Sequence, residues 1–292
     1  MRVALAQLDA RLGEVEANLG RAREILAEAG AGGADLVVFP ELFLSGYALH
    51  EVGGDTTRTA EEVAGALTNG PAAVVGFHEP REALTQDRSN RGAVEPTRPG
   101  SDPPGWNSAA YVEQGRVVHV HRKLYLVDYE PFGEDEIFEP GSELRAFDTR
   151  LGRLATLICN DAWQPFVPFI AAQDGACVLL VPSCSSTAVP EAECYWRELT
   201  RFHARMLQCW VVFVNRVGSE AGLTFWGGSH VVDPNGEVVA EAPRLAESIL
   251  FAGLELARVE ERRRELPVVG HPRLDLLRSE LERLSSRNAS VR

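Results

Sequence analysis

Residues 36–47 read LVVFPELFLSGY, and this stretch indicates the fold class. The apolar run Leu36–Phe39 is typical of a short buried strand, and the proline after it ends the strand because proline cannot donate to a sheet ladder. Glu41 follows directly. Upstream, Arg2–Leu8 predicts another buried strand, and Glu14–Ala29 predicts a helix because its apolar residues recur at helical spacing. Strand, helix and strand in succession favour a mixed α/β fold.

The same alternation continues along the chain. The predicted helices are Thr59–Leu67, Phe166–Gln173 and Glu191–Gln208, and the predicted strands are Ala72–Phe77, Ala176–Val181, Trp210–Asn215 and two that flank the turn at 234–236. Two hairpins are expected where alternating runs flank a turn, at 107–113 with 116–121 and at 144–148 with 152–158. Residues 79–105 are polar and rich in Pro, Arg and Gly, which predicts a long loop.

The domain organisation follows from length and from the absence of internal repeats. A chain of 292 residues lies near the upper limit for one domain, and no repeat or linker divides it. We expect residues 1–265 to form one domain and residues 266–292 to form a C-terminal helical extension. The charged helices predicted at Leu256–Glu265 and Arg273–Leu284 have too few apolar residues for a core of their own. They are expected to pack on the body or on a second subunit.

Composition excludes several classes of function. The chain carries 29 basic and 42 acidic residues, a net charge of −13, so we expect no nucleic-acid or anionic-membrane surface, since both need clustered positive charge. The five cysteines are an odd number without a CxxC pair, which fits neither a disulfide framework nor a zinc site. The N-terminus resembles no signal peptide, and no apolar run reaches the length of a membrane span. A cytoplasmic enzyme with reduced thiols and no metal is expected.

The basic residues are unevenly divided between the two types. Of the 29, a single one is lysine, Lys123, which leaves 28 arginines. Chance survival is one explanation. The other is a task that arginine cannot perform, because an ammonium is a compact charge with an adjustable pKa, whereas a guanidinium is a broad fork.

Three predicted strands end next to a reactive residue. Glu41 follows LVVFP, Lys123 follows VVHVHR, and Cys159 follows RLATLI. Taken singly, each is more often a solvated charge or a small buried side chain. Catalytic groups in α/β proteins collect at the carboxyl ends of strands, so we expect these three side chains to converge.

The segments FPELFLSGY (39–47), HRKLYL (121–126) and LICNDAW (157–163) resemble the three signature blocks of the nitrilase, or carbon–nitrogen hydrolase, superfamily. The resemblance extends over about residues 2–265. It implies a four-layer αββα sandwich and a catalytic triad of Glu41, Lys123 and Cys159 that needs no cofactor.

The loop after Lys123 is similar to that of the glutaminase-type domain of glutamine-dependent NAD synthetases, up to the closing Pro140-Gly141. This resemblance implies that Glu134 is a fourth catalytic residue, with Glu130, Glu136 and Glu139 as solvated alternatives. The chain lacks a synthetase domain, so an ammonia-accepting synthetase would act as a partner in trans.

Amide hydrolysis needs a nucleophile, a base and a group that stabilises the oxyanion. In the reaction that the resemblance implies, the Cys159 thiolate attacks the carbonyl and Glu41 transfers the protons. Lys123 and the backbone N–H of Asn160 bind the oxyanion. Tyr47, Phe132 and Trp163 are candidate walls of a substrate pocket, and Ser183, Ser185 and Arg197 are candidates for binding polar ends of the substrate.

The leading hypothesis is an amidase, possibly glutaminase-like, acting on a small carboxamide. An N-carbamoyl amino acid amidohydrolase of the β-ureidopropionase type and a nitrilase are alternatives with the same chemistry. A catalytically silent binding or assembly module, suggested by the 79–105 loop and the charged C-terminal helices, is the alternative from another class. A homodimer or larger homo-oligomer is expected.

Overall fold

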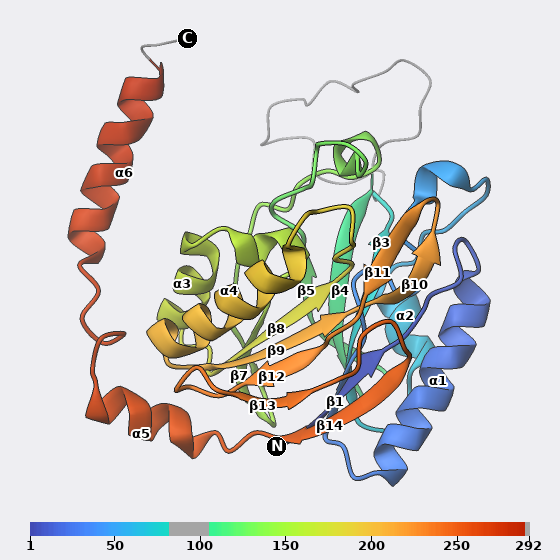
Figure 1. The fold of residues 1–292 in the computed structure, drawn as a ribbon, viewed down its shortest axis with the longest axis horizontal. Helices are drawn as coiled ribbons and strands as arrows, with labels where there is room; N and C mark the ends of the chain where they lie inside the picture. The colour runs from blue at the N-terminus through green and yellow to red at the C-terminus, as the bar shows by residue number, and fades with distance from the viewer. Residues whose placement is uncertain (82–104, 290–292) are drawn as a thin grey trace.

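The computed structural model describes residues 1–81 and 105–289, so the predicted loop at 79–105 falls almost entirely outside the described residues. Two six-stranded sheets form the centre of the molecule (Figure 1). In spatial order, the first sheet contains β14 (Ser248–Gly253), β1 (Arg2–Gln7), β2 (Leu36–Val38), β3 (Ala72–Glu79), β4 (Trp106–Glu113) and β5 (Arg116–Arg122). The second contains β13 (Val238–Glu241), β12 (His230–Val232), β9 (Trp210–Asn215), β8 (Val178–Ser183), β7 (Gly152–Thr156) and β6 (Phe147–Thr149).

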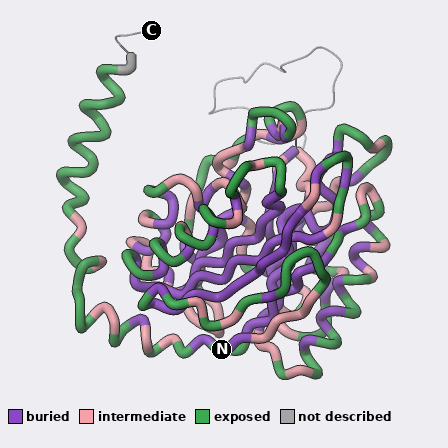
Figure 2. Tube along the Cα trace, in the orientation of Figure 1, coloured by how far each residue is buried: buried purple, intermediate pink, exposed green. Residues whose placement is uncertain are grey.

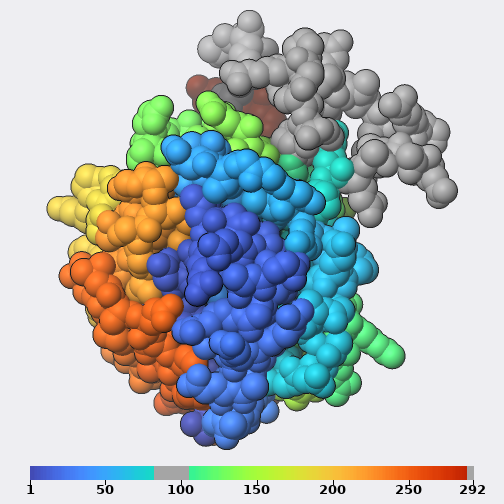
Figure 3. All heavy atoms as spheres, turned by 90° about the vertical axis from the view of Figure 1, so that its right-hand side faces the viewer, coloured from blue at the N-terminus to red at the C-terminus, as the bar shows by residue number. Residues whose placement is uncertain are grey.

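Helices cover the outer face of each sheet. Helices α1 (Val15–Ala31) and α2 (Ala60–Ala66) pack on the first sheet, and α3 (Phe166–Gln173) and α4 (Ala192–Leu207) pack on the second. The predicted αββα sandwich is therefore confirmed. The face that carries α1 shows the N-terminal residues between the segment around residues 50–80 and the C-terminal strands (Figure 3), which matches the order β14-β1-β2-β3.

The period-two alternation of the strands explains how one sheet fills two cores. In β1, Ala4 and Ala6 lie in the core beneath α1, whereas Val3 and Leu5 point into the core between the two sheets. All four side chains are fully buried. Burial of one such aliphatic side chain stabilises the fold by about 1.5–3 kcal/mol. A one-residue slip of register would exchange the two faces, so the packing of both cores specifies the register.

Three strands were not predicted from the sequence. Strand β14 pairs antiparallel with β1, from Arg2 opposite Gly253 to Gln7 opposite Ser248. Most of β14 is only partly buried and lacks alternation, because it is the edge strand. The hairpin of β10 (Val217–Glu220) and β11 (Leu223–Trp226) was also missed.

The C-terminal helices differ in how they relate to the body. Val259 of α5 (Ala257–Glu265) is buried against the core between the sheets. Helix α6 (Leu274–Ala289) stands away from the body (Figure 1), and its residues 274–287 are exposed along their whole length (Figure 2). The expected packing of this segment on the body is therefore not found for α6. Contact with a second subunit stays a prediction.

Across residues 1–81 and 105–289, no helix has the length and apolar character that a membrane crossing requires.

Candidate active site

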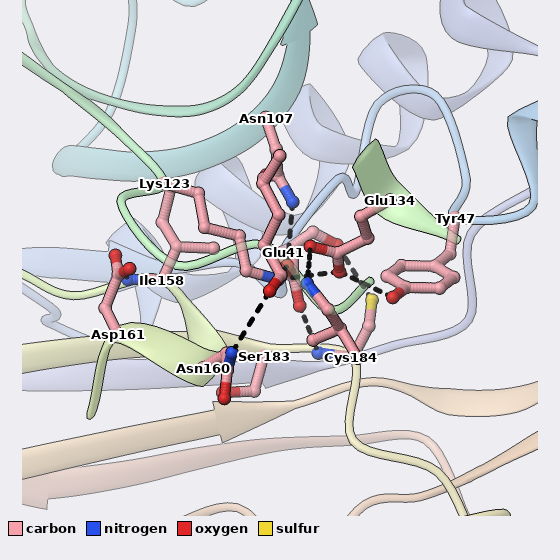
Figure 4. A network of polar contacts seen from close by, with 12 residues as sticks. Glu41, Tyr47, Asn107, Lys123, Glu134, Ile158, Asn160, Asp161, Ser183 and Cys184 are labelled. Atoms are coloured by element: carbon pink, nitrogen blue, oxygen red, sulfur yellow. Dashed lines mark hydrogen bonds and ion pairs between the residues drawn. The ribbon is translucent and has the colours of Figure 1, made fainter. Parts of the chain in front are cut away.

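The three residues expected to converge do so at one end of the sandwich. Glu41 follows β2, Lys123 follows β5, and Cys159 follows β7 and opens the short 3-10 helix η3 (Cys159–Trp163). Strands β2 and β5 point the same way, because β2 is parallel to β3, and β3 and β5 are both antiparallel to β4. The carboxyl ends of these strands therefore deliver their side chains to a common edge (Figure 4).

Lys123 is the centre of the site. Its ammonium donates to Oε1 of Glu41 and to Oε1 of Glu134, each at 2.7 Å. The Lys123 side chain is completely buried, as is that of Glu41. Figure 4 shows both carboxylates near the end of the Lys123 side chain. The two carboxylates therefore compensate the charge of the buried ammonium. The guanidinium of an arginine is wider and would displace them.

Glu41 is held by neutral donors as well. Its Oε1 also accepts from Nδ2 of Asn107, at 2.8 Å, and its Oε2 accepts from the backbone N–H of Cys184, at 2.8 Å. Strand β4 supplies Asn107, and Cys184 directly follows β8. The carboxylate is thus oriented by groups from both sheets.

Glu134 is the loop glutamate that the fold brings to Lys123. It lies in the short helix η2 (Glu134–Glu136) and is 2% exposed, whereas Glu130 and Glu136 are exposed. Glu139 pairs with Arg81 instead. The Oε1 of Glu134 accepts from the hydroxyl of Tyr47 at 2.5 Å.

Electrostatics keep the lysine charged. Burial alone would lower the pKa of Lys123, but the carboxylates of Glu134 and Glu41 outweigh it and hold that pKa well above its ordinary value. Burial, followed by the neighbouring Glu134, likewise raises the pKa of the Tyr47 hydroxyl well above its ordinary value. At neutral pH the site therefore contains an ammonium and a protonated phenol that can donate hydrogen bonds.

The thiol of Cys159 is protonated at rest. Burial, and then the negative charge of Glu41, raise its pKa well above its ordinary value, while the Lys123 ammonium acts in the opposite direction. A base must therefore remove the proton before attack, since the thiolate is the nucleophile.

The backbone presents the thiol in a sharp turn. Cys159 has φ of +45°, in the left-handed region that costs a residue with a Cβ about 1–2 kcal/mol. Such strain persists where the surroundings hold it in place and is common at functional sites. Here the turn leaves Cys159 partly exposed, although Ile158 before it is fully buried.

Cys159 opens into a cavity of about 80 Å³. This volume admits water or a small ligand, since a cavity of roughly 10–15 Å³ already holds one water molecule. Four residues expected at a substrate pocket line it, namely Tyr47, Phe132, Asn160 and Trp163. Ser185, also considered from the sequence, lines it too. The amide of Asn160 donates to the carbonyl oxygens of Tyr125, at 3.2 Å, and Leu126, at 3.4 Å, so its side chain braces the loop after Lys123.

Two predicted binding residues lie elsewhere. Ser183 is fully buried in β8 and is not part of the cavity lining; its hydroxyl points to the carbonyl of Val181, at 3.4 Å. Arg197 lies on the exposed side of α4, where it pairs with Glu241. The structure does not bring either side chain to the cavity, because successive strand residues alternate in direction and Arg197 occupies the solvent face of its helix.

Sequence reasoning missed other contributors. Asn107 is a buried amide near the start of β4, whose residues are buried from Asn107 to Val112. Tyr129 and Ser186 line the cavity from loops that no periodicity predicts. Glu220 accepts from the backbone N–H groups of Tyr47, at 2.8 Å, and Ala48, at 2.6 Å, and so fixes the loop that carries Tyr47.

The thiols and acidic groups were also considered as metal ligands. Within the part of the chain that the structure describes, no three His, Cys, Asp or Glu side chains are grouped to hold a metal ion. All five cysteines are free.

Comparison with protein families matches residues 2–264 to the carbon-nitrogen hydrolase family. The chain belongs to this family. This membership confirms the predicted superfamily and the enzyme class, a hydrolase acting on carbon–nitrogen bonds.

Relatives of this carbon-nitrogen hydrolase fall into two lengths. The glutamine-dependent NAD(+) synthetase of Thermotoga maritima is 30% identical over 93% of this chain but only 46% of its own length. The chain thus spans about half the length of this relative. An omega-amidase of Bos taurus is 30% identical over 97% of this chain and 98% of its own.

A solved structure adds a chemical comparison. A variant of the amidase from Nesterenkonia sp. AN1 is 25% identical, has a TM-score of 0.72 and covers 96% of each chain. In that protein, the acetamide moiety of fluoroacetamide is covalently added at the active site cysteine.

Proposed function

We propose that this carbon-nitrogen hydrolase is an amidase that hydrolyses a small carboxamide through a thioester on Cys159 and releases ammonia. The observation that carries the proposal is the Lys123 ammonium, held at 2.7 Å from both Glu41 and Glu134 beside a partly exposed thiol. Relatives of full matching length include an omega-amidase, which supports amide substrates.

In the acylation step, Glu41 takes the proton of Cys159 as the sulfur bonds to the amide carbon. The carbonyl π electrons move to oxygen, and Lys123 and the backbone N–H of Asn160 donate to this oxyanion. One such donor is commonly worth about 3 kcal/mol of transition-state stabilisation. When the intermediate collapses, the C–N bond breaks and Glu41 passes its proton to the departing ammonia.

Deacylation repeats these steps with water. Glu41 takes a proton from water, whose oxygen attacks the thioester carbon, and the second intermediate expels the Cys159 sulfur. The proton then returns from Glu41 to the sulfur, and the carboxylic acid leaves. We assign to Glu134 the role of holding Lys123 in place and to the Tyr47 hydroxyl that of holding Glu134.

The cavity supports a small substrate with few charges. Its volume of about 80 Å³ suits a short acyl group. Among the described residues that line it, none is basic, and the polar groups include the hydroxyls of Ser185, Ser186, Tyr47 and Tyr129 and the amide of Asn160. An uncharged aliphatic amide therefore suits this lining better than glutamine, whose carboxylate would meet no basic side chain among these described lining residues.

The experiment is an ammonia-release screen across acetamide, propionamide, glutamine, asparagine, N-carbamoyl amino acids and short nitriles, with Cys159→Ala as the control. We expect the highest kcat/KM for a short amide and no turnover by the variant. Carbon dioxide released with ammonia would instead identify an N-carbamoyl amidohydrolase, and turnover of nitriles alone would identify a nitrilase.

A catalytically silent module is tested separately. Mass-spectrometric peptide mapping after brief iodoacetamide treatment measures the labelling of each cysteine. The amidase proposal requires Cys159 to react faster with this amide-bearing reagent than the more exposed Cys194. Equal or slower labelling of Cys159, together with a negative screen, would favour the silent module.

A further inference from the structure

A buried aspartate joins the two segments that carry Lys123 and Cys159. Asp161 lies in η3, two residues after the nucleophile, and its exposed fraction is 0%. Its Oδ1 accepts from the backbone N–H groups of Leu124, at 2.9 Å, and Tyr125, at 3.0 Å. These residues directly follow the catalytic lysine.

The other oxygen of Asp161 interacts with both the segment that carries Lys123 and the segment that carries Cys159. Oδ2 accepts from the backbone N–H of Ile158, at 3.0 Å, and lies 2.8 Å from Nε2 of His121. Because an ionised carboxylate only accepts, this ring nitrogen carries the proton. His121 and Leu124 flank the lysine segment, and Ile158 precedes the nucleophile. Figure 4 shows Asp161 beside Ile158 and near the stem of Lys123.

The backbone around the nucleophile depends on the same residue. Asp161 also donates its own N–H to the carbonyl of Ile158, at 3.0 Å, so it closes the turn in which Cys159 adopts its positive φ. Four donors fill both carboxylate oxygens, and a buried acceptor with this many partners is costly to disturb. The segment after β5 and the turn after β7 belong to different sheets, and Asp161 bonds to both.

We propose that Asp161 is a positioning residue, which sets the distance between the Lys123 ammonium and the Cys159 sulfur without contacting substrate. This inference rests on the proposed amidase mechanism and adds a residue to it. A displacement of about 1 Å in catalytic groups is enough to cost about 10²-fold in rate.

The test is Asp161→Asn, which keeps the shape but leaves a single acceptor oxygen for four donors. We expect kcat for the best amide to fall about 10²-fold while KM changes less than threefold, because the cavity lining is intact. Iodoacetamide should also label Cys159 more slowly at pH 8. Lys123 lowers the pKa of this thiol, so moving the ammonium away reduces the thiolate fraction.

Asp233→Asn is the matched control. Asp233 is 4% exposed and its Oδ1 likewise accepts two backbone N–H groups, from Asn235 and Glu237, each at 3.0 Å, in a turn that is not part of the cavity lining. The Asp233→Asn variant should be less stable than the wild type but should keep its kcat and the reactivity of the Cys159 thiol. If the two variants retained kcat and labelling rates within twofold of each other, at equal folded fraction, the proposal would be overturned.

A second pair of variants covers the case in which Asp161→Asn does not fold. His121→Leu removes one donor and leaves the three backbone hydrogen bonds, whereas His121→Gln retains a donor. We expect a partial loss of kcat in His121→Leu and recovery in His121→Gln; equal activity of the two would contradict the positioning role. The rate at which iodoacetamide labels Cys159 can be measured without amide turnover. If the wild type released no ammonia, the proposed function would be wrong, but the labelling rates would still test the role of Asp161.

Discussion

Nζ of Lys123 lies 2.7 Å from Oε1 of Glu134, a residue 11 positions further along the chain, and both side chains are buried. The hydrogen bond links the end of β5 to η2 and gives the lysine a second carboxylate beside Glu41. The ammonium is consequently held from two sides in a space that admits one small cation.

Lys123→Arg should abolish the activity although it keeps the positive charge. The guanidinium fork is wider than an ammonium and would separate Glu41 from Glu134 or enter the space of the oxyanion. Loss of the oxyanion donor and of its geometry together should lower kcat/KM by at least about 10³-fold. Steady-state ammonia release measures this effect. Arg197→Lys, on the surface, is the reciprocal control and should match the wild type; a comparable loss in both would contradict the assignment.

Glu41→Gln should shift the pH profile of Cys159 alkylation to lower pH while abolishing amide hydrolysis. The negative charge of Glu41 raises the pKa of this thiol, so its removal lets the thiolate form at lower pH. Hydrolysis stops because glutamine cannot transfer protons. Peptide-level labelling with iodoacetamide between pH 6 and 10 measures the profile. Glu136→Gln, at an exposed glutamate, should leave it in place. An unshifted profile in Glu41→Gln would show that burial alone sets this pKa.

Glu220→Gln should lower stability and weaken substrate binding together. The Glu220 carboxylate pairs with the buried Arg216 at 2.7 Å and fixes the loop that carries Tyr47. Arg216 keeps its ion pair with Asp9 at 2.8 Å, so the variant loses one charge-assisted contact and not the whole compensation of the guanidinium. We expect a cost of about 2 kcal/mol, which corresponds to a melting temperature lower by roughly 4 °C. KM should rise as Tyr47 moves. Calorimetry and steady-state kinetics measure the two effects.

Glu16→Gln provides the control for Glu220→Gln. Glu16 forms an exposed ion pair with Arg58 at 2.8 Å, and such a pair is worth less than about 1 kcal/mol. Equal destabilisation by both variants would mean that the buried pair contributes no more than a surface one.

Deletion of residues 272–292 should leave the unfolding temperature of the body unchanged. Helix α6 lies in this segment and its residues 274–287 are exposed, so its removal uncovers no core. Differential scanning calorimetry at low concentration checks this; a lower melting temperature would mean that α6 packs on the body. Light scattering on the same samples tests the predicted second subunit, since a smaller mass after deletion would place α6 at an interface.

The sequence by itself determined the elements and the reactive positions. Apolar periodicity is a local property, so it predicted β1, α1 and β2 within a few residues of their ends. The reactive side chains Glu41, Lys123 and Cys159 each follow a predicted strand, and a single lysine among the basic residues singled out Lys123. The place after a strand was a weak signal for each residue taken singly, so the prediction of Glu41 and Cys159 rested more on the resemblance to the signature blocks of the superfamily.

The tertiary structure decided which other groups contact Glu41, Lys123 and Cys159. Asn107 and Cys184 donate to Glu41 across 66 and 143 residues of chain, and no local pattern contains such a contact. The structure also places Arg197 on the surface and Ser183 in the core, although both were predicted to bind substrate. Local sequence encodes which face of a strand or helix is apolar. The packing of two sheets against each other determines which polar side chains those faces bring together.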